Sequence, residues 1–435
     1  MNAPEKIGNV IFLIGAVLLF VLLFDELLFL GLFLLFSLSI LTILFLYKKK
    51  IASRLLILLI AIVFLVHLSA TLAIHYAHFQ PFGDGGGDFS LYDREAKDIL
   101  QLFKQGDLFS SKVSYHSYSF VVASVYFMTS SQMLGGELFN VWLVLISIIC
   151  VFLIVKEIGG SDKQAFAAGL VANFYPSLLF YGSLLIKDAV IVCVCMLWLI
   201  LTIKLIKSFS WAKFLILYAL LAVIINFRVY VGLAAVATFI FCWQLLSKVK
   251  MRKRVVYSII MAVLIGFLFQ VSGYGYYGIN IARSYIHKID FYQNYAYSNE
   301  SELSTGSTVK FENYLESFTS TVLGPFPWHI KYKRQMVILA ETFSWYVLFF
   351  FICKAVVKNL KRNKMFIPLI IFSFLVFSVL AIFVNNFGIT SRIRMPAFLA
   401  LLCLMPFGLD LEGGFFIKIM SFFKKYGNFR RHTLL

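Results

Sequence analysis

Acidic residues and cysteines are both scarce in this chain of 435 residues. Asp and Glu number 21 against 39 Lys and Arg, and only 14% of the residues carry a charge. The six cysteines all lie within apolar segments, and Cys193 and Cys195, two positions apart, would point to different faces of a helix. This distribution speaks against a disulfide framework and against a zinc site built from cysteines.

The charge distribution also disfavours nucleic-acid binding. A net charge of +18 in a soluble protein would suggest such a partner. Here the basic residues stand in stretches between apolar segments, and these stretches show no pattern of a soluble domain. We therefore expect no nucleic-acid partner and attribute the excess charge to the topology of a membrane protein.

Apolar residues dominate what is present. They make up 61% of the chain, the mean hydropathy is +0.88, and 48 residues are phenylalanine, which suits a surface in contact with membrane lipids. Since a helix needs about 20 apolar residues to cross a bilayer, we expect an all-α, multi-pass integral membrane protein with about 12 to 13 transmembrane helices. The expected spans are 7–24, 27–47, 52–74, 138–155, 164–183, 188–205, 211–227, 229–247, 255–273, 336–356, 365–384 and 395–411.

Six clusters of Lys and Arg between the apolar segments predict the orientation of the chain. Positive charge in short loops stays cytoplasmic, so both termini and all six clusters are expected on that side. The loops that hold Asp88, Lys187, Arg228, Arg392 and the stretch 275–335 then share the external side. The clusters are Lys48–Lys50, Lys156 with Lys163, Lys204 with Lys207 and Lys213, Lys248–Arg254, Lys358–Lys364 and Lys424–Arg431.

The segment 118–134 conflicts with this alternation if it crosses the bilayer. It is short and rich in Ser, Thr and Tyr, and a full crossing would move Lys248–Arg254 to the external side. We therefore expect it to be re-entrant or to lie at the outer interface, where polar backbone can line a cavity. The alternative is that it crosses and that another expected span does not.

Two external loops stand out within the expected organisation of the chain. In the loop 75–117, Ser90–Asp93 has the pattern of a capping box, and the amphipathic helix that follows is expected to stop at Gly106 and to lie on the membrane surface. The loop 275–335 is long and Tyr-rich, and it ends in the rigid turn Gly324–Trp328. The expected parts are a transmembrane hairpin at 1–50, a core at 51–411 and a basic cytoplasmic tail at 412–435.

Three motifs in order along the chain carry a resemblance to a known family. The first, DFSLYDREA at 88–96, is similar to the first external loop of GT-C glycosyltransferases that use polyprenyl-phosphate sugars. The stretch 174–188, from Phe-Tyr-Pro to Leu-Ile-Lys-Asp, resembles the span with proline and the charged turn of the dolichyl-phosphate-mannose protein mannosyltransferase-like group. The third, SRIRMP at 391–396, resembles the entry to a late span in bacterial members.

The resemblance covers residues 75–405 and implies a GT-C-like fold in a bacterial inner membrane. It implies an inverting glycosyltransferase that moves a sugar from undecaprenyl or dolichyl phosphate to an acceptor hydroxyl on the external face. The acceptor stays open between a lipid, a lipid-linked glycan and a protein. The family has an acidic pair near the first span, whereas here three glycines separate Asp84 from Asp88, so either residue could match.

The expected chemistry needs a base for the hydroxyl proton and cations for the departing phosphate. Asp88 is the candidate base, because a helix N-terminus favours the ionised carboxylate, and Asp84 is a second candidate or its partner. The alternative for Asp88 is a role in the turn or cap alone. The candidate phosphate ligands are Arg392, Arg394, Arg228, Lys187 and Lys331; the alternative for each is an anchor that reaches toward lipid headgroups.

Aromatic and histidine side chains complete the candidate site. Tyr92 belongs to the first motif, Trp328 stands in a turn flanked by prolines, and His329 and His116 share the expected external side. Tyr and Trp also form the ordinary interfacial belt, and a lone histidine is more often structural. No spacing of His and carboxylates argues for a bound metal, although some relatives in the resembling family use a divalent cation.

Two other functions compete with this interpretation. An O-antigen-type polysaccharide polymerase would also use external arginines and polyprenyl-linked substrates, but it would need room for two lipid carriers. A transporter of lipid-linked oligosaccharides should show inverted repeats and charges near the middle of the membrane. We expect an enzyme in which Asp88, Lys187, Arg228, Arg392 and the turn 324–329 line one cavity.

Overall fold

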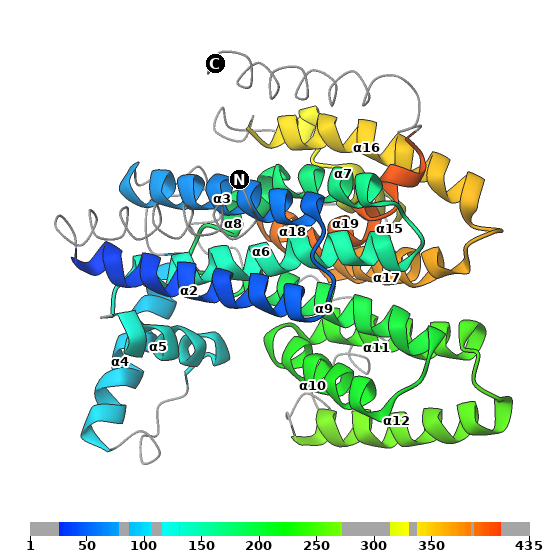
Figure 1. Cartoon of the computed structure of the whole chain (residues 1–435), viewed down its shortest axis with the longest axis horizontal. Helices are drawn as coiled ribbons and strands as arrows, with labels where there is room; N and C mark the ends of the chain where they lie inside the picture. The colour runs from blue at the N-terminus through cyan, green and yellow to red at the C-terminus, as the bar shows by residue number, and fades with distance from the viewer. Residues whose placement is uncertain are drawn as a thin grey trace, which may run out of the picture.

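The computed structural model describes residues 26–77, 87–106, 115–129, 131–271, 314–329, 337–383 and 387–409. Within these ranges the chain is helical and forms no β-strand, which confirms the predicted all-α class. Most of the long helices run side by side along one direction (Figure 1). The helices are α2 (Glu26–Lys48), α3 (Arg54–Ala77), α4 (Asp88–Gln105), α5 (Ser117–Thr129), α6 (Met133–Glu157), α7 (Asp162–Asn173), α8 (Pro176–Tyr181), α9 (Asp188–Lys207), α10 (Trp211–Phe227), α11 (Val229–Leu246), α12 (Met251–Val271), α15 (Tyr314–Leu323), α16 (Val337–Asn359), α17 (Ile367–Phe383), α18 (Phe387–Ile393) and α19 (Met395–Leu402).

Seven helical segments in the described part of the chain are long and apolar enough to cross a membrane. They are α2, α3, α6, α9, α11, α16 and the segment Lys364–Ile382, which includes α17. Helices α10 and α12 occupy the expected spans 211–227 and 255–273. The expected span 7–24, most of the loop 275–335 and the tail 412–435 lie outside the described residues.

Helices α6 and α9 form the centre of the bundle. In the most apolar stretch of each helix, 78% of the residues of α6 and 83% of those of α9 are buried, against 22% in α2. Both are apolar on all sides, which is the pattern of a helix surrounded by protein. Helices α2, α3 and α7 pack around α6, and α10 packs on α9, so the first residues of α9 are held inside the bundle.

Two of the expected spans are wrong as single helices. The span 164–183 is broken between α7 and α8, because proline disfavours helical backbone in the residue before it, and Tyr175 is extended (φ −65°, ψ 114°) ahead of Pro176. The span 395–411 is α19 followed by a 3-10 turn, η4 (Met405–Phe407). Tyr175 and residues 395–405 are buried by neighbouring helices, so the freed backbone groups do not meet lipid.

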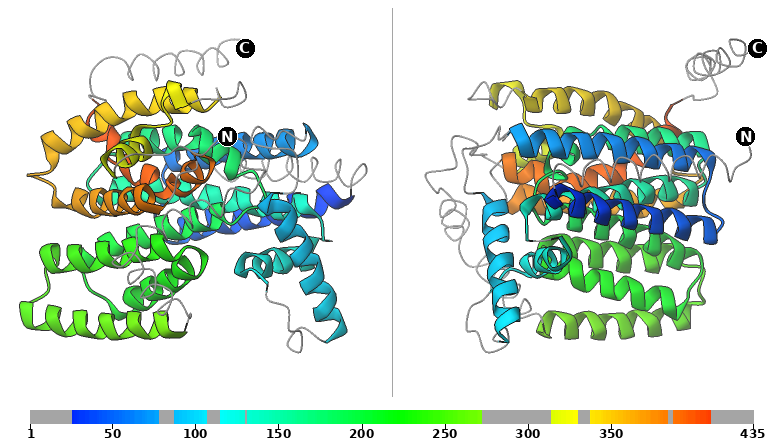
Figure 2. Two further views of the ribbon diagram at one scale, coloured as in Figure 1. Left: turned by 180° about the vertical axis from the view of Figure 1, so that it is seen from behind. Right: turned by 60° about the vertical axis from the view of Figure 1, so that its left-hand side comes forward.

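Helix α4 lies across one end of the bundle, nearly perpendicular to the long helices (Figure 2). It ends as predicted, with Gly106 in the left-handed conformation (φ 79°). The predicted capping box at Ser90 is wrong: the helix begins at Asp88, and the Ser90 hydroxyl donates instead to the carbonyl of Gly87 (2.9 Å). An amphipathic helix in this position suits a membrane surface, as the sequence indicated.

The basic turns lie at the other end. The α2–α3, α11–α12 and α16–α17 turns, which carry three of the six Lys and Arg clusters, are all opposite α4 (Figure 1). This arrangement agrees with the orientation predicted from charge. Helix α5, with 13 residues, is roughly 20 Å long and is too short for a hydrocarbon core of about 30 Å. It packs on α4, which agrees with the prediction that 118–134 does not cross.

Candidate active site

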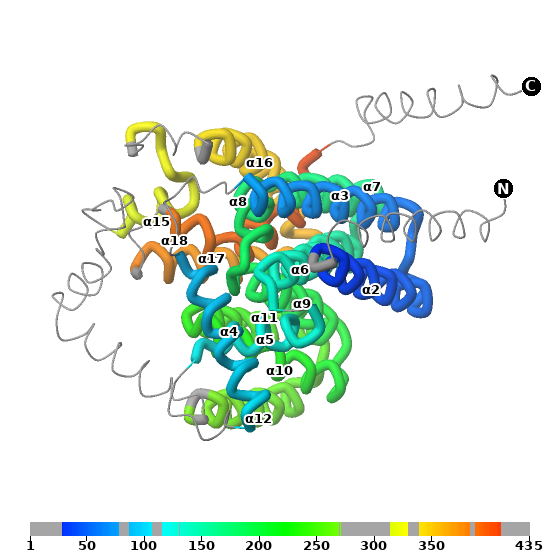
Figure 3. Tube along the Cα trace, turned by 90° about the vertical axis from the view of Figure 1, so that its left-hand side faces the viewer, coloured from blue at the N-terminus to red at the C-terminus, as the bar shows by residue number. Residues whose placement is uncertain are grey.

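Four segments that are distant in sequence bring charged side chains together at the α4 end of the bundle, which Figure 3 views end-on. Asp88 is the first residue of α4, Asp188 is the first of α9, Arg228 joins α10 to α11, and Arg392 lies in the last turn of α18. Together with Lys187, we call these residues the charge cluster. The structure therefore brings together Asp88, Lys187, Arg228 and Arg392, as predicted, whereas the turn 324–329, which was expected to line the same cavity, is held by Arg394.

Asp188 is the centre of the charge cluster. Its carboxylate is buried, with 2% of the side chain exposed. Oδ1 accepts a hydrogen bond from Nη2 of Arg228 (2.7 Å), while Oδ2 accepts from Nε and Nη2 of Arg392 (3.0 and 2.8 Å). Nη2 of Arg392 also donates to Oδ2 of Asp88 (2.6 Å), whose side chain is 46% exposed. Two guanidinium groups thus share one buried carboxylate, and Asp88 stands at the accessible rim.

Helix α6 fixes the turn that precedes Asp188. The buried Asn140 side chain donates from Nδ2 to the carbonyls of Leu184 (2.7 Å) and Ile186 (3.1 Å). Gly136 allows this close approach, since a Cβ there would lie 2.3 Å from a methyl carbon of Leu185. The start of α9 is therefore held against the central helix, and the position of Asp188 does not depend on its ion pairs alone.

Aromatic side chains orient the two guanidinium groups from the other side. Nη1 of Arg228 donates to the hydroxyl of Tyr230 (2.7 Å), and Cζ of Arg392 lies 5.8 Å from the centre of the Tyr181 ring, within cation–π range. Burial alone would lower the pKa of Arg392, but Asp188 and Asp88 raise it above its ordinary value. Both arginines are thus charged and held in place before any ligand arrives.

Lys187 gives the charge cluster an excess of positive charge. Among the described residues its ammonium group forms no ion pair, although it interacts electrostatically with both arginines and both carboxylates. Burial, followed by the charge of Arg228, lowers the pKa of Lys187 below its ordinary value. Three cations facing two carboxylates leave a net positive site, which is suited to an anionic group such as a phosphate.

Tyr92 and His116 brace α4 against α5. The Tyr92 ring is buried and packs edge-on against the rings of His116 and Tyr118, at 5.7 and 5.0 Å between centroids. Burial, together with the negative charges of Asp88 and Asp188, raises the pKa of Tyr92. His116 in turn contacts a carboxylate oxygen of Glu95 through Nδ1 (2.9 Å). These contacts hold α4 on α5 and thereby support Asp88.

Arg394 does not join the charge cluster. Its guanidinium is buried, forms an ion pair with Glu341 (3.0 Å) and donates to the carbonyl of Gly324 (2.6 Å). This corrects its predicted place beside Arg392. The turn that includes Trp328 and His329 is thereby tied to Arg394, and the indole of Trp328 is 74% exposed and stacked on Phe326. Two further predicted site residues, Asp84 and Lys331, lie outside the described residues.

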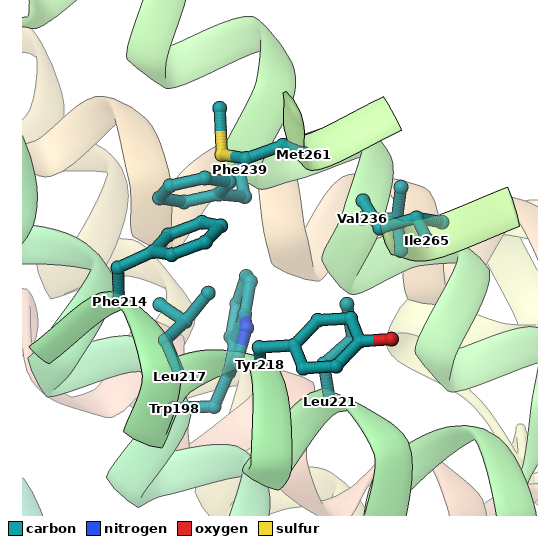
Figure 4. A pocket seen from close by; sticks show the side chains of 9 residues that line it. All are labelled: Trp198, Phe214, Leu217, Tyr218, Leu221, Val236, Phe239, Met261 and Ile265. Atoms are coloured by element: carbon teal, nitrogen blue, oxygen red, sulfur yellow. The ribbon is translucent and has the colours of Figure 1, made fainter. Parts of the chain in front are cut away.

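An apolar pocket lies away from the charge cluster. The pocket lies between α9, α10, α11 and α12, and its lining includes Trp198, Phe214, Phe239 and Met261 with no charged side chain (Figure 4). It is therefore not the predicted cavity around the charge cluster. Within the described ranges, no group of three or more His, Cys, Asp or Glu side chains is placed to hold a metal ion.

Sequence reasoning missed two residues of this site. Asp188 was not among the predicted site residues, yet it pairs with arginines 40 and 204 positions away. A carboxylate at the start of an apolar helix, on the same predicted side as Arg228 and Arg392, was the available signal. Tyr181 gave no such signal, because its contact with Arg392 depends on the break before α8.

The fold and the charge cluster together define a multi-pass, all-α membrane protein with a positively charged site at one end. Residues 117–272 match the family model described as dolichyl-phosphate-mannose-protein mannosyltransferase. The structure is similar to that of ArnT from Cupriavidus metallidurans, which was solved bound to undecaprenyl phosphate, with a TM-score of 0.50 and 12% sequence identity. The predicted resemblance to the GT-C glycosyltransferases, and their fold, are confirmed by these two matches.

The two matches cover only parts of the chains that they compare. The structural match covers 80% of this chain but 59% of the ArnT chain. At 12% identity, the likeness to ArnT concerns the fold and does not transfer a substrate. Among curated proteins, no sequence matches this chain.

Proposed function

We propose that the chain is a glycosyltransferase that moves a sugar from a polyprenyl-phosphate donor to a hydroxyl of an acceptor. The observation that carries this proposal is the charge cluster: Arg228, Arg392 and Lys187 surround a buried carboxylate, with Asp88 at the exposed rim. The family match of residues 117–272 and the ArnT-like fold support the same reaction class. The basic turns at the opposite end support a site on the external face of the membrane.

In the proposed reaction, the donor phosphate lies against Arg392, Arg228 and Lys187. The acceptor oxygen attacks the anomeric carbon from the face opposite the phosphate, and the bond from that carbon to the phosphate oxygen breaks with inversion. Asp88 accepts the hydroxyl proton as the general base. Polyprenyl phosphate leaves with the bonding electron pair, and the three cations stabilise its added negative charge.

The ion pair between Asp88 and Arg392 fits the resting state of such a site. The carboxylate of Asp88 is half exposed, so exchanging it for a phosphate oxygen on Arg392 costs little, as is usual for exposed pairs. Donor binding would thereby release Asp88 toward the acceptor. The buried pairs of Arg392 and Arg228 with Asp188 need not break, and they keep both guanidinium groups in position.

Arg392→Ala is expected to weaken donor binding more than it slows the chemical step. Each lost charge-assisted hydrogen bond to phosphate is worth roughly 1.5–3 kcal/mol, so the donor Kd should rise by about 10-fold to 100-fold. The measurement is binding of undecaprenyl phosphate to the purified protein in nanodiscs. Arg252→Ala, which removes an exposed arginine from the first turn of α12 at the opposite end, is the control. Equal affinity in both variants would rule out Arg392 as a phosphate ligand.

Lys187 should make donor binding sensitive to alkaline pH. Because the pKa of its buried ammonium is lowered, the group loses its charge at a lower pH than an ordinary lysine does. Affinity for undecaprenyl phosphate should therefore fall as pH rises through that depressed pKa, and Lys187→Arg should retain affinity to higher pH. The measurement is Kd between pH 7 and 10.5, with Lys97→Arg on the exposed face of α4 as the control. A profile that Lys187→Arg leaves unchanged would contradict the role of this ammonium.

A further inference from the structure

A second polar network, separate from the charge cluster, surrounds the buried carboxylate of Glu341 on α16. Its Oε1 accepts hydrogen bonds from Nη2 of Arg394 (3.0 Å) and from the hydroxyl of Tyr175 (3.1 Å). Its Oε2 accepts from the backbone N–H (2.9 Å) and the hydroxyl (2.5 Å) of Ser177. All four residues are at most 6% exposed, so this carboxylate is fully engaged inside the protein.

This network joins the break in the expected span 164–183 to the junction between α18 and α19. Tyr175 and Ser177 flank Pro176, where α8 begins, and Arg394 stands between α18 and α19. Arg394 also donates to the carbonyls of Thr321 (3.2 Å) and Gly324 (2.6 Å). One buried ion pair therefore holds α8, α16, the α18–α19 junction and the end of α15 together.

Both ends of the network lead to Arg392. On one side, Arg394 is two residues further along the chain, so fixing it fixes the last turn of α18. On the other side, α8 ends at Tyr181, whose ring lies 5.8 Å from Cζ of Arg392 and whose hydroxyl donates to the carbonyl of Gly388 in α18 (3.4 Å). A shift at the start of α8 or at the α18–α19 junction would move the Arg392 guanidinium relative to Asp188.

We propose that Glu341 is a positioning residue that sets the geometry of Arg392 through Arg394 and α8. The inference depends on the proposed role of Arg392 as a ligand of the donor phosphate. Glu341 itself contacts no part of the charge cluster. A buried, fully hydrogen-bonded carboxylate suits this task, because breaking any of its bonds leaves an unpaired polar group and so disfavours other arrangements of the four segments.

Glu341→Gln is expected to misplace Arg392 while keeping the size of the side chain. A displacement of about 1 Å at a site of this kind lowers activity by on the order of 100-fold, so kcat/KM for the donor should fall to that extent. Glu137→Gln is the matched control: Glu137 on α6 is equally buried and ion-paired, but its partner is His75 on α3 (2.7 Å). Its loss should leave donor use close to that of the wild type.

A double-mutant cycle separates positioning from general stability. If Glu341 acts through Arg392, then Glu341→Gln with Arg392→Ala should bind undecaprenyl phosphate no more weakly than Arg392→Ala alone. Additive losses of affinity would overturn the inference. If Arg392→Ala alone kept the affinity of the wild type, the proposed function would be overturned instead. If Glu341→Gln does not fold, Tyr175→Phe, which removes a single hydrogen bond to the same carboxylate, should show a smaller but still non-additive loss.

Discussion

Asp88→Asn should abolish most of the transfer while leaving the donor bound at least as tightly as in the wild type. The amide keeps the size of the side chain but cannot accept the hydroxyl proton, and loss of a general base typically costs about 10²-fold to 10⁴-fold in rate. The structure adds an expectation for binding: Arg392 loses the competing charge of Asp88 (2.6 Å) and becomes more available to phosphate. The measurements are single-turnover transfer from a radiolabelled polyprenyl-phosphate sugar and Kd for undecaprenyl phosphate.

The control for Asp88 lies on the same helix. Asp98 is exposed on α4, ten residues from Asp88, so Asp98→Asn makes the same chemical change without touching the charge cluster. It should retain wild-type transfer. If Asp88→Asn retains it as well, the base is another residue, and Asp84, four residues earlier in the same loop, is the next candidate. If Asp88→Asn instead loses donor binding, its carboxylate organises the site and does not serve as the base.

The ordering of loops by charge predicted which segments share one end of the bundle. Asp88 and Arg392 are 304 positions apart, yet they form an ion pair. Each is separated by one expected membrane crossing from the basic cluster that precedes it, so both were placed on the external side. Counting crossings in this way requires only the composition and the length of the apolar segments, and both can be obtained from a single sequence. The same reasoning favoured a segment 118–134 that does not cross, and α5 is too short to cross.

The directions of individual side chains could not be obtained in this way. Arg392 and Arg394 were both assigned to phosphate, but residues two apart on a helix point to nearly opposite sides, and Arg394 is buried against Glu341. That spacing could have separated them. The shared side of Asp188 and Arg392 could be predicted, but their pairing across 204 positions could not, because it depends on how α9 and α18 pack. Pro176 indicated the break between α7 and α8, which positions Tyr181. The continuous hydropathy of 164–183 nevertheless favoured a single helix.

Removing the charge of Asp188 should destabilise the protein more than any other change in the charge cluster. Asp188→Asn leaves Arg228 and Arg392, whose side chains are 9% and 19% exposed, without their shared carboxylate. Breaking a buried pair by removing one partner costs about 3–5 kcal/mol, so thermal unfolding in nanodiscs should begin at a clearly lower temperature. Asp162→Asn, which breaks a pair with Lys156 in which both side chains are 41% exposed, should change stability by about 0–1 kcal/mol.

The same variant tests whether the charge cluster is built for an anion. In Asp188→Asn the two arginines lack a counter-charge, and a bound phosphate would supply one. Undecaprenyl phosphate should therefore raise the unfolding temperature of Asp188→Asn by more than it raises that of the wild type, since a ligand that binds only the folded state stabilises it more the tighter it binds, in step with the logarithm of its affinity. Undecaprenol, which has the same chain without the phosphate, should not have this effect. Equal stabilisation by the phosphate and the alcohol would mean that the arginines hold Asp188 for structural reasons and do not bind a phosphate.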